Sequence, residues 1–137
     1  MCLVGVALTN TLATAASKVV VGLAYTAQFK SVKLAYGSAT GTALTKRKKI
    51  DQLGLILRNT HASGIEFGDS FDHLSKIGKA DLPLSSGTPD TDHVFTEYDQ
   101  DMMRVNTSWD TDSRLCLQAT APKPCTVLAA IIGLDTK

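Results

Sequence analysis

The residues that could carry out chemistry are few and far apart in the sequence. The three histidines, His61, His73 and His93, match neither an HExxH zinc motif nor a pair of ligands on one element. A Ser–His–Asp site is recognised by geometry rather than by spacing, but the chain has no nucleophile-elbow pattern. We therefore predict that the chain is not an enzyme.

Carboxylates recur in a spacing that can present two of them to calcium. None of these D-x-D pairs stands in a twelve-residue EF-hand frame with its central glycine and terminal glutamate. We therefore predict solvated acidic loops, with no metal and no cofactor. The pairs are Asp90 with Asp92, Asp99 with Asp101, and Asp110 with Asp112.

A glycine-containing segment, residues 37–42 (GSATGT), precedes Lys46 and invites comparison with a phosphate-binding loop. In a Walker A loop the lysine directly follows the last glycine, so that its ammonium reaches the phosphates held by the backbone. Here Lys46 stands further along the chain. Because the glycines permit the backbone of a reversing loop, the segment predicts a β-hairpin.

The most distinctive charged feature is a basic run made of Lys46, Arg47, Lys48 and Lys49. Four adjacent cations in a strand would place two charges on each face. Proteins that read nucleic acids usually add aromatic side chains for stacking, and none interleaves with this run. The run therefore favours non-specific contact with a phosphate backbone, pairing with an acidic neighbour, or a solvated strand end.

Charge is distributed unevenly along the chain, although the formal net charge is only +1. Residues 1–60 hold eight Lys or Arg and one Asp, whereas residues 61–137 hold six Lys or Arg and twelve Asp or Glu. Such asymmetry is typical of a surface that faces nucleic acid or of complementary faces that pair between subunits. Two independently solvated halves are the alternative.

Cysteine usage and hydropathy indicate neither a disulfide scaffold nor a targeting segment. Cys2, Cys116 and Cys125 are too few for a disulfide framework, so we predict free thiols, with a Cys116–Cys125 contact across a terminal hairpin as the alternative. The N-terminal residues lack a positive region, and residues 9–11 (TNT) interrupt their apolar run, so we predict no signal peptide. No stretch approaches the ~18 apolar residues of a membrane span.

Length and patterning predict a single all-β domain over residues 1–137. The 137 residues, 44% of them hydrophobic and 20% charged, suit one soluble domain with its own core. Alternating β-branched and apolar residues favour an antiparallel β-sandwich or a barrel-like fold. We predict a long acidic loop or arm over residues 69–106. We expect strands at residues 3–9, 18–25, 31–36, 44–58, 65–67, 113–119 and 125–134.

The strand predicted at residues 44–58 contains both the basic run and the alternating residues Leu53, Leu55 and Leu57. That alternation indicates one face packed on a core. Lysine, glutamine and leucine are also good helix formers, so a helix over residues 46–57 is the alternative, which Gly54 disfavours.

Several of these segments together resemble the C-terminal region of a family of short-tailed phage proteins, the tail tubular protein B or nozzle family. The similar segments are VVVGLAY at 19–25, GTAL at 41–44, the basic run leading into LGLIL at 53–57, WDTDSRL at 109–115 and Pro-Lys-Pro at 122–124. The resemblance spans residue 11 to the C-terminus. The chain differs in having Ala24 where the family commonly has proline, and in matching only the last segment of much longer proteins.

The resemblance implies a virion structural protein that surrounds the DNA ejection channel of the phage tail. It implies a homo-oligomer, a hexameric ring, in contact with other tail proteins such as adaptor, fibre or nozzle subunits. It also implies non-specific contact with viral DNA, no membrane anchor, and host cytoplasm as the place of assembly. It carries over no catalytic residue. Lys46, Arg47, Lys48 and Lys49 match a basic position of the pattern, and we expect them to line the channel or contact a neighbouring subunit.

Overall fold

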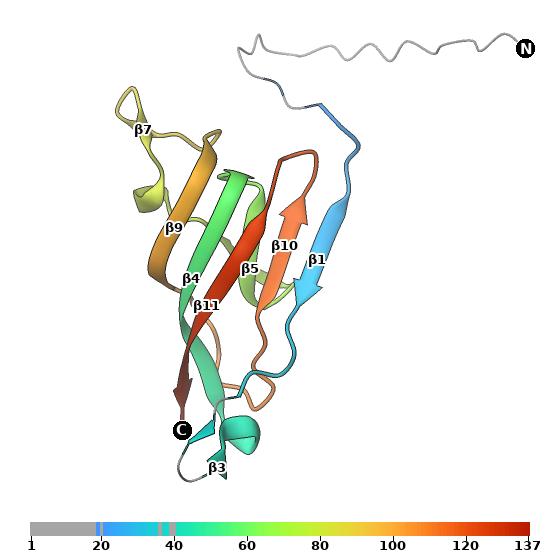
Figure 1. Cartoon of the computed structure of the whole chain (residues 1–137), viewed down its shortest axis with the longest axis vertical. Helices are drawn as coiled ribbons and strands as arrows, with labels where there is room; N and C mark the ends of the chain where they lie inside the picture. The colour runs from blue at the N-terminus through green and yellow to red at the C-terminus, as the bar shows by residue number, and fades with distance from the viewer. Residues whose placement is uncertain (1–18, 20, 36, 39–40) are drawn as a thin grey trace, which may run out of the picture.

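The computed structural model describes residues 19, 21–35, 37–38 and 41–137, and its regular structure consists of antiparallel β-strands with two short 3-10 turns (Figure 1). This confirms the all-β prediction. The elements are β1 Thr26–Lys30, β2 Gly37–Ser38, β3 Gly41–Thr42, η1 Ala43–Thr45, β4 Lys48–His61, β5 Ile65–Ser70, β6 His73–Lys76, η2 Lys79–Asp81, β7 Leu84–Ser85, β8 Thr88–Pro89, β9 Val94–Arg104, β10 Cys116–Thr120 and β11 Val127–Thr136.

The strands of the described residues form two larger sheets and two small ribbons. One sheet has the order β1-β10-β5-β6 and the other β11-β4-β9, while β2 pairs with β3 and β7 with β8. Every pairing is antiparallel. No helix in this part of the chain is long and apolar enough to cross a membrane.

The four-stranded sheet has one apolar and one polar face, as alternating strand residues require. On the apolar face, Phe29 of β1 pairs with Leu117 of β10, which pairs in turn with Phe67 of β5. The polar face carries a ladder of side-chain contacts across four strands. Gln28 donates to Gln118 at 2.8 Å, Gln118 donates to Glu66 at 3.3 Å, and Lys76 pairs with Glu66 at 3.3 Å.

The central strand of the three-stranded sheet, β4, buries Leu53, Leu55 and Leu57, which confirms the predicted alternation. A strict alternation continued from Leu53 toward the start of β4 would bury Asp51, but Ile50 is buried instead. The alternation therefore changes phase between Ile50 and Leu53. The pairing with β11 shifts register here, because Gln52 and Ile50 oppose consecutive residues of β11. The extra residue, Asp51, is a β-bulge, which accounts for the change of phase.

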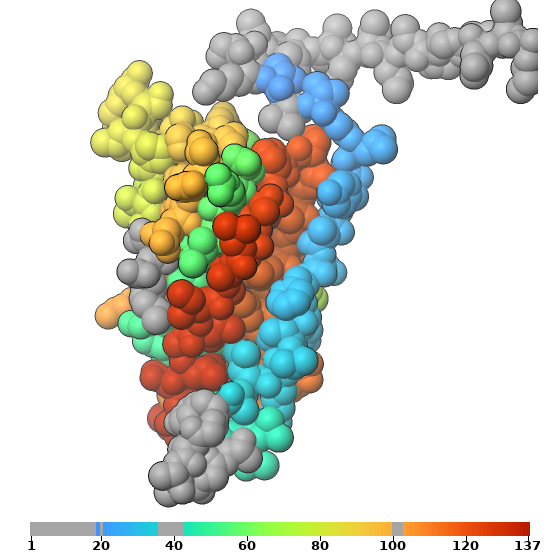
Figure 2. All heavy atoms as spheres, in the orientation of Figure 1, coloured from blue at the N-terminus to red at the C-terminus, as the bar shows by residue number. Residues whose placement is uncertain are grey.

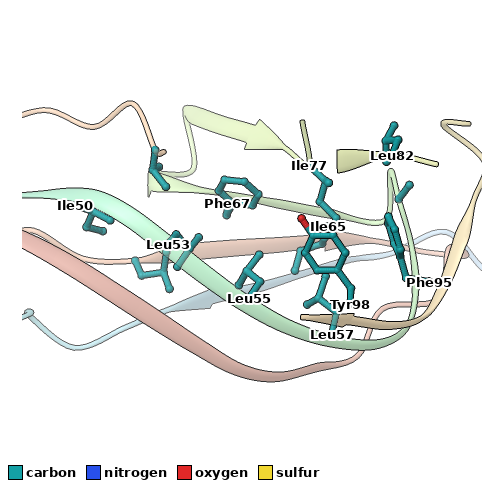
Figure 3. Close-up of a cluster of buried hydrophobic side chains, with 13 residues drawn as sticks. Ile50, Leu53, Leu55, Leu57, Ile65, Phe67, Ile77, Leu82, Phe95 and Tyr98 are labelled. Atoms are coloured by element: carbon teal, nitrogen blue, oxygen red, sulfur yellow. The ribbon is translucent and has the colours of Figure 1, made fainter. Parts of the chain in front are cut away.

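Both sheets contribute to one hydrophobic cluster, which Figure 3 shows from close by. Burial of apolar side chains in such a cluster is the main favourable term in folding. Thirteen buried residues make up the cluster: Ile50, Leu53, Leu55, Leu57, Ala62, Ile65, Phe67, Ile77, Leu82, Phe95, Tyr98, Val105 and Leu115.

The long loop predicted over residues 69–106 is wrong for much of its length. This stretch contains β6 and the eleven-residue β9, which pairs with β4 along most of its length. Phe95 and Tyr98 of β9 are buried, with ring centroids 4.8 Å apart. Their spacing of three breaks the period of two that marks a strand, and exposed polar residues between them resemble a loop. The acidic composition therefore belongs to an edge strand and its connections.

Strand boundaries differ most from prediction in the first half of the chain. The described residues between 19 and 25 are not in a strand, and β1 begins at Thr26. Residues 31–35 are also outside strands, although the Ser31 and Leu34 amides donate to backbone oxygens beside β10. The strand predicted at residues 3–9 lies outside the described residues. The strands predicted at 65–67, 113–119 and 125–134 correspond to β5, β10 and β11.

Candidate functional site: a basic cluster around Trp109

The basic run does not lie in one strand, so the predicted placement of two charges on each face is wrong. The 3-10 turn η1 occupies Ala43–Thr45, and β4 begins only at Lys48. Lys46 and Arg47 lie in the connection between them and are exposed. The four side chains consequently have different surroundings.

Lys48 is fully buried, with a relative exposure of 0%. Its Nζ atom lies 3.0–3.1 Å from four backbone carbonyl oxygens, those of Ala43, Leu44, Lys46 and Thr111. The Ala43 oxygen also accepts the Lys46 amide at 3.2 Å, and an ammonium group has three N–H donors to share among the four oxygens. Lys48 therefore holds η1 against the segment after β9, and its charge is not available at the surface.

Trp109 reaches the basic run through a backbone bridge next to it. The Lys48 amide donates to the Asp110 oxygen at 2.7 Å, and the Asp110 amide donates back to the Lys48 oxygen at 2.8 Å. Arg47 Nη2 donates to the Trp109 oxygen at 3.3 Å. A segment 62 residues further along the chain is thus fixed beside Arg47.

Two ammonium groups lie near the half-buried Trp109 ring. Lys137 Nζ is 4.7 Å from the ring centroid and Lys49 Nζ is 6.0 Å from it. Both distances are within the range of cation–π attraction. We define the basic–aromatic cluster as Lys46, Arg47, Lys49, Trp109 and Lys137. It lies where the start of β4 meets the end of β11, at the lower end of the molecule in Figure 1.

Carboxylates border the basic–aromatic cluster without neutralising all of it. Lys49 Nζ lies 3.3 Å from Asp51 Oδ1. Backbone amides of Asp112 and Thr111 lower the pKa of Asp110, and the charge of Lys33 lowers it further. Within the described part of the chain, no ion pair within 4.0 Å involves Lys46 or Arg47. These two cations are therefore the ones most available to an external anion.

The arrangement of cations can bind a polyanion. Lysine and arginine side chains neutralise phosphates without reading sequence. The half-buried Trp109 adds an aromatic ring beside these cations, the kind of group on which unpaired bases stack. Carboxylates of a neighbouring protein surface are the other anions that such a cluster can meet.

The three histidines lie on different elements. His61 ends β4, where it is buried and its Nδ1 accepts a hydrogen bond from the Ser63 amide at 3.1 Å. Burial lowers the pKa of His61, and the charge of Lys123 lowers it further.

The other two histidines lie elsewhere. His73 begins β6, and the His93 ring stands edge-on to the Phe95 ring with centroids 4.8 Å apart. Among the described residues, no group of three His, Cys, Asp or Glu side chains could hold a metal ion.

Two of the three D-x-D pairs form local turns. Asp90 Oδ1 accepts the Asp92 amide at 3.1 Å, and Asp110 Oδ1 accepts the Asp112 amide at 3.2 Å. Asp and Asn often bond the backbone two residues ahead in this way. The third pair, at positions 99 and 101, lies in β9.

The structure also places the remaining sequence features. The predicted hairpin, with a loop at residues 37–41 between strands at 31–36 and 44–58, is not the one found. Residues 31–35 are outside strands, β4 pairs with β11 and β9, and the short pair β2–β3 lies at the predicted loop itself. Cys116 and Cys125 are free thiols, and burial raises the pKa of both. Cys2 lies outside the described residues.

Trp109 was not predicted as a partner of the basic run. No aromatic residue stands among Lys46 to Lys49, and the ring comes from a distant loop. The available signal was a single tryptophan in a polar stretch between Ser108 and Asp110.

No protein-family model, curated protein or solved structure matches this chain.

Proposed function

We propose that the chain is a structural subunit of a short phage tail that assembles into a ring around the DNA ejection channel. In this proposal the basic–aromatic cluster faces the channel and contacts the DNA backbone. Lys48 is removed from the expected contact residues because it is buried, which leaves Lys46, Arg47 and Lys49.

The observation that carries the proposal is the gathering of cations at one end of the molecule, where Lys137 and Lys49 lie 4.7 Å and 6.0 Å from the Trp109 ring and Arg47 contacts the Trp109 oxygen. A DNA channel needs weak contacts that do not depend on sequence, because the whole genome must pass through it. Phosphate contacts tolerate any sequence. The resemblance of residues 19–25 and 109–115 to the nozzle family supports the same reading.

A second candidate is a non-specific nucleic-acid-binding β domain without a tail assembly. The same cluster favours it, because cations beside an aromatic ring suit single strands. The two candidates differ in assembly. The tail proposal requires a closed ring, whereas a binding domain acts as a monomer or a small oligomer.

DNA contact is tested by fluorescence anisotropy of a labelled oligonucleotide at several salt concentrations. Replacing Lys46, Arg47 and Lys49 by glutamine removes three cations. We expect the slope of log affinity against log salt to fall by about 2–3, since each phosphate contact contributes about 0.9. Lys79→Gln, an exposed lysine on η2 outside the cluster, is the matched control and should leave the slope unchanged.

Stacking is tested separately with Trp109→Leu. Loss of a stacked base costs about 1–3 kcal/mol, so affinity for a single strand should fall by about fivefold to about 150-fold. Affinity for a duplex should change much less, because its bases are already stacked.

Equal DNA binding by the wild type and by the triple glutamine variant would refute the role of the basic–aromatic cluster.

A further inference from the structure

We propose that copies of this chain join by exchanging an extended segment: residues 21–25 of one copy lie in an apolar groove between β1 and β11 of the next. The inference rests on the proposed assembly into a homo-oligomer, and it names the two surfaces that would make the contact.

The groove has a volume of about 470 Å³ and opens between the edge strands of the two larger sheets. In Figure 2 the orange atoms of β10 are visible between β11 and β1, which border the groove. Its lining is mostly apolar and includes Ala27, Phe29, Leu117, Ala119, Val127 and Ala130. Phe29 is 56% exposed although it continues the apolar face of its sheet.

The groove exists because the two sheets differ in width. Four strands make one sheet and three make the other, and β1 and β11 are the edge strands on the groove side. A further strand beside β11 would cover Phe29 and complete the second sheet. Edge strands carry unpaired backbone groups, and strand addition to such an edge is a common mode of recognition.

A matching apolar stripe, Val21, Leu23 and Tyr25, lies on the same molecule. Their relative exposures are 78%, 89% and 66%. In this structure residues 21–25 are outside strands and the chain bends at Gly22. Once the segment pairs as a strand in the groove, side chains two residues apart share one face, so the stripe would present three apolar groups together. A strand with this alternation can place one apolar face against an apolar groove.

The stripe cannot occupy the groove of its own copy. Tyr25 directly precedes β1, and its backbone oxygen accepts the Ala121 amide at 2.8 Å. Gly22 lies so close to Pro122 that an added Cβ would stand 2.8 Å from the proline Cβ. These contacts hold the segment against the turn between β10 and β11, at the start of β1. Reaching along its own β11 would require breaking both contacts, whereas the groove of a second copy is open to it.

Such a contact is heterologous, because the stripe and the groove are different surfaces. Each copy would give one segment and receive another. Repeated heterologous contacts close into a ring when the rotation between copies allows it. The exchange would therefore supply the joint of the ring proposed above.

The test is a complementation experiment on the full chain, read by light scattering after size-exclusion chromatography. Val21→Asp with Leu23→Asp removes the stripe and keeps the groove. Ala130→Glu, at an exposed groove position, blocks the groove and keeps the stripe. Leu84→Asp, a 70% exposed leucine on β7 outside the groove, is the matched control.

We expect the wild type and the control to be oligomeric, and each of the two test variants to be monomeric. Mixing the two test variants should give a 1:1 heterodimer that grows no further, because only one working stripe and one working groove are present. This result also shows that both variants are folded. A monomeric wild type, or two variants that do not combine, would overturn the exchange.

Cross-linking gives an independent measurement of the same contact. Cys125 lines the groove, so a cysteine placed at Leu23 should form a disulfide with Cys125 of a second copy when Cys2 and Cys116 are replaced by serine. Ala24→Cys, whose side chain would face away from the groove, is the control. Equal cross-linking at positions 23 and 24 would contradict the proposed orientation.

Failure of the exchange can be told from failure of the proposed function. Neither test variant alters the basic–aromatic cluster. If the wild type forms rings and both test variants still do, the exchange fails and the ring proposal stands. If the wild type is monomeric, both fail, and steeply salt-dependent DNA binding would then favour the second candidate function. If the variants complement but DNA is not bound, the exchange stands and the channel contact fails.

Discussion

Replacement of Lys48 by methionine removes the buried ammonium group and keeps a long apolar stem. In the wild type the Nζ atom contacts four carbonyl oxygens at 3.0–3.1 Å. The variant leaves those oxygens without this donor. It therefore isolates the contribution of the ammonium group to holding η1 and the Thr111 segment together.

The expected loss follows from the number and burial of the contacts. A hydrogen bond from a charged donor contributes about 1.5–3 kcal/mol net, and three N–H groups are available. The bond to Ala43 is buried, whereas those to Leu44, Lys46 and Thr111 are partly buried. Water can reach the partly buried oxygens once the ammonium is gone. We therefore expect a loss of about 2–4 kcal/mol in the free energy of unfolding, rather than the full sum.

The assay is urea denaturation followed by circular dichroism, together with a thermal melt. A loss of this size lowers the melting temperature by about 10 °C for a domain of this length. Lys46→Met is the matched control, because Lys46 is two positions away and exposed. We expect the control to change the free energy of unfolding by less than about 0.5 kcal/mol.

Two outcomes would refute the reasoning about Lys48. One is a Lys48→Met variant within about 0.5 kcal/mol of the wild type, which would mean that the carbonyl oxygens do not depend on the ammonium. The other is an equal loss in Lys46→Met, which would locate the effect in the charge of the run rather than in burial.

Three further predictions concern single buried or close-packed positions. Thr60→Val should cost about 1–3 kcal/mol in denaturant titrations, because the buried Thr60 hydroxyl bonds the Thr126 amide at 3.0 Å and a valine leaves that amide unpaired. Gly68→Ala should cost about 1–3 kcal/mol, because its Cβ would overlap the His73 oxygen across the β5–β6 pair; a neutral result would mean that the two strands separate readily. The lowered pKa of His61 means that the unfolded chain binds more protons below about pH 6.5, so the free energy of unfolding should fall between about pH 7 and pH 5. His61→Gln should flatten that slope, and an unchanged slope would assign it to other groups.

Patterning predicted the fold class because most buried strand positions obey a period of two. Leu53, Leu55 and Leu57 alternate visibly, and the polar ladder through Gln118 leaves the opposite face of β10 apolar. The class was therefore readable from local sequence, whereas the pairing order of the strands was not. Register depends on contacts between segments far apart in the chain, as in the pairing of β4 with both β9 and β11.

The errors arose where a residue's role is set by a distant partner. β9 was taken for a loop because Phe95 and Tyr98 are three residues apart and polar side chains stand between them. Lys48 was expected at the surface because lysine is almost never fully buried unless it is paired. Its partners are backbone oxygens. Every residue carries one, so the sequence does not show which of them will contact a lysine.

The candidate site was predicted in part. The basic run located Lys46, Arg47 and Lys49, since adjacent charges are a local signal. Trp109 and Lys137 joined the cluster only through tertiary structure, by the bridge between Lys48 and Asp110 and the pairing of β4 with β11. Spacing in sequence cannot show such a juxtaposition.

Assembly into a ring can be seen by electron microscopy of the purified chain at low salt. We expect closed rings of identical subunits around an open centre, which dissociate when Val21 and Leu23 are replaced by aspartate. We also expect that added DNA occupies the centre of the wild-type ring and binds less well when Lys46, Arg47 and Lys49 are replaced by glutamine. A field of single, monodisperse monomers at high protein concentration would contradict assembly into a ring.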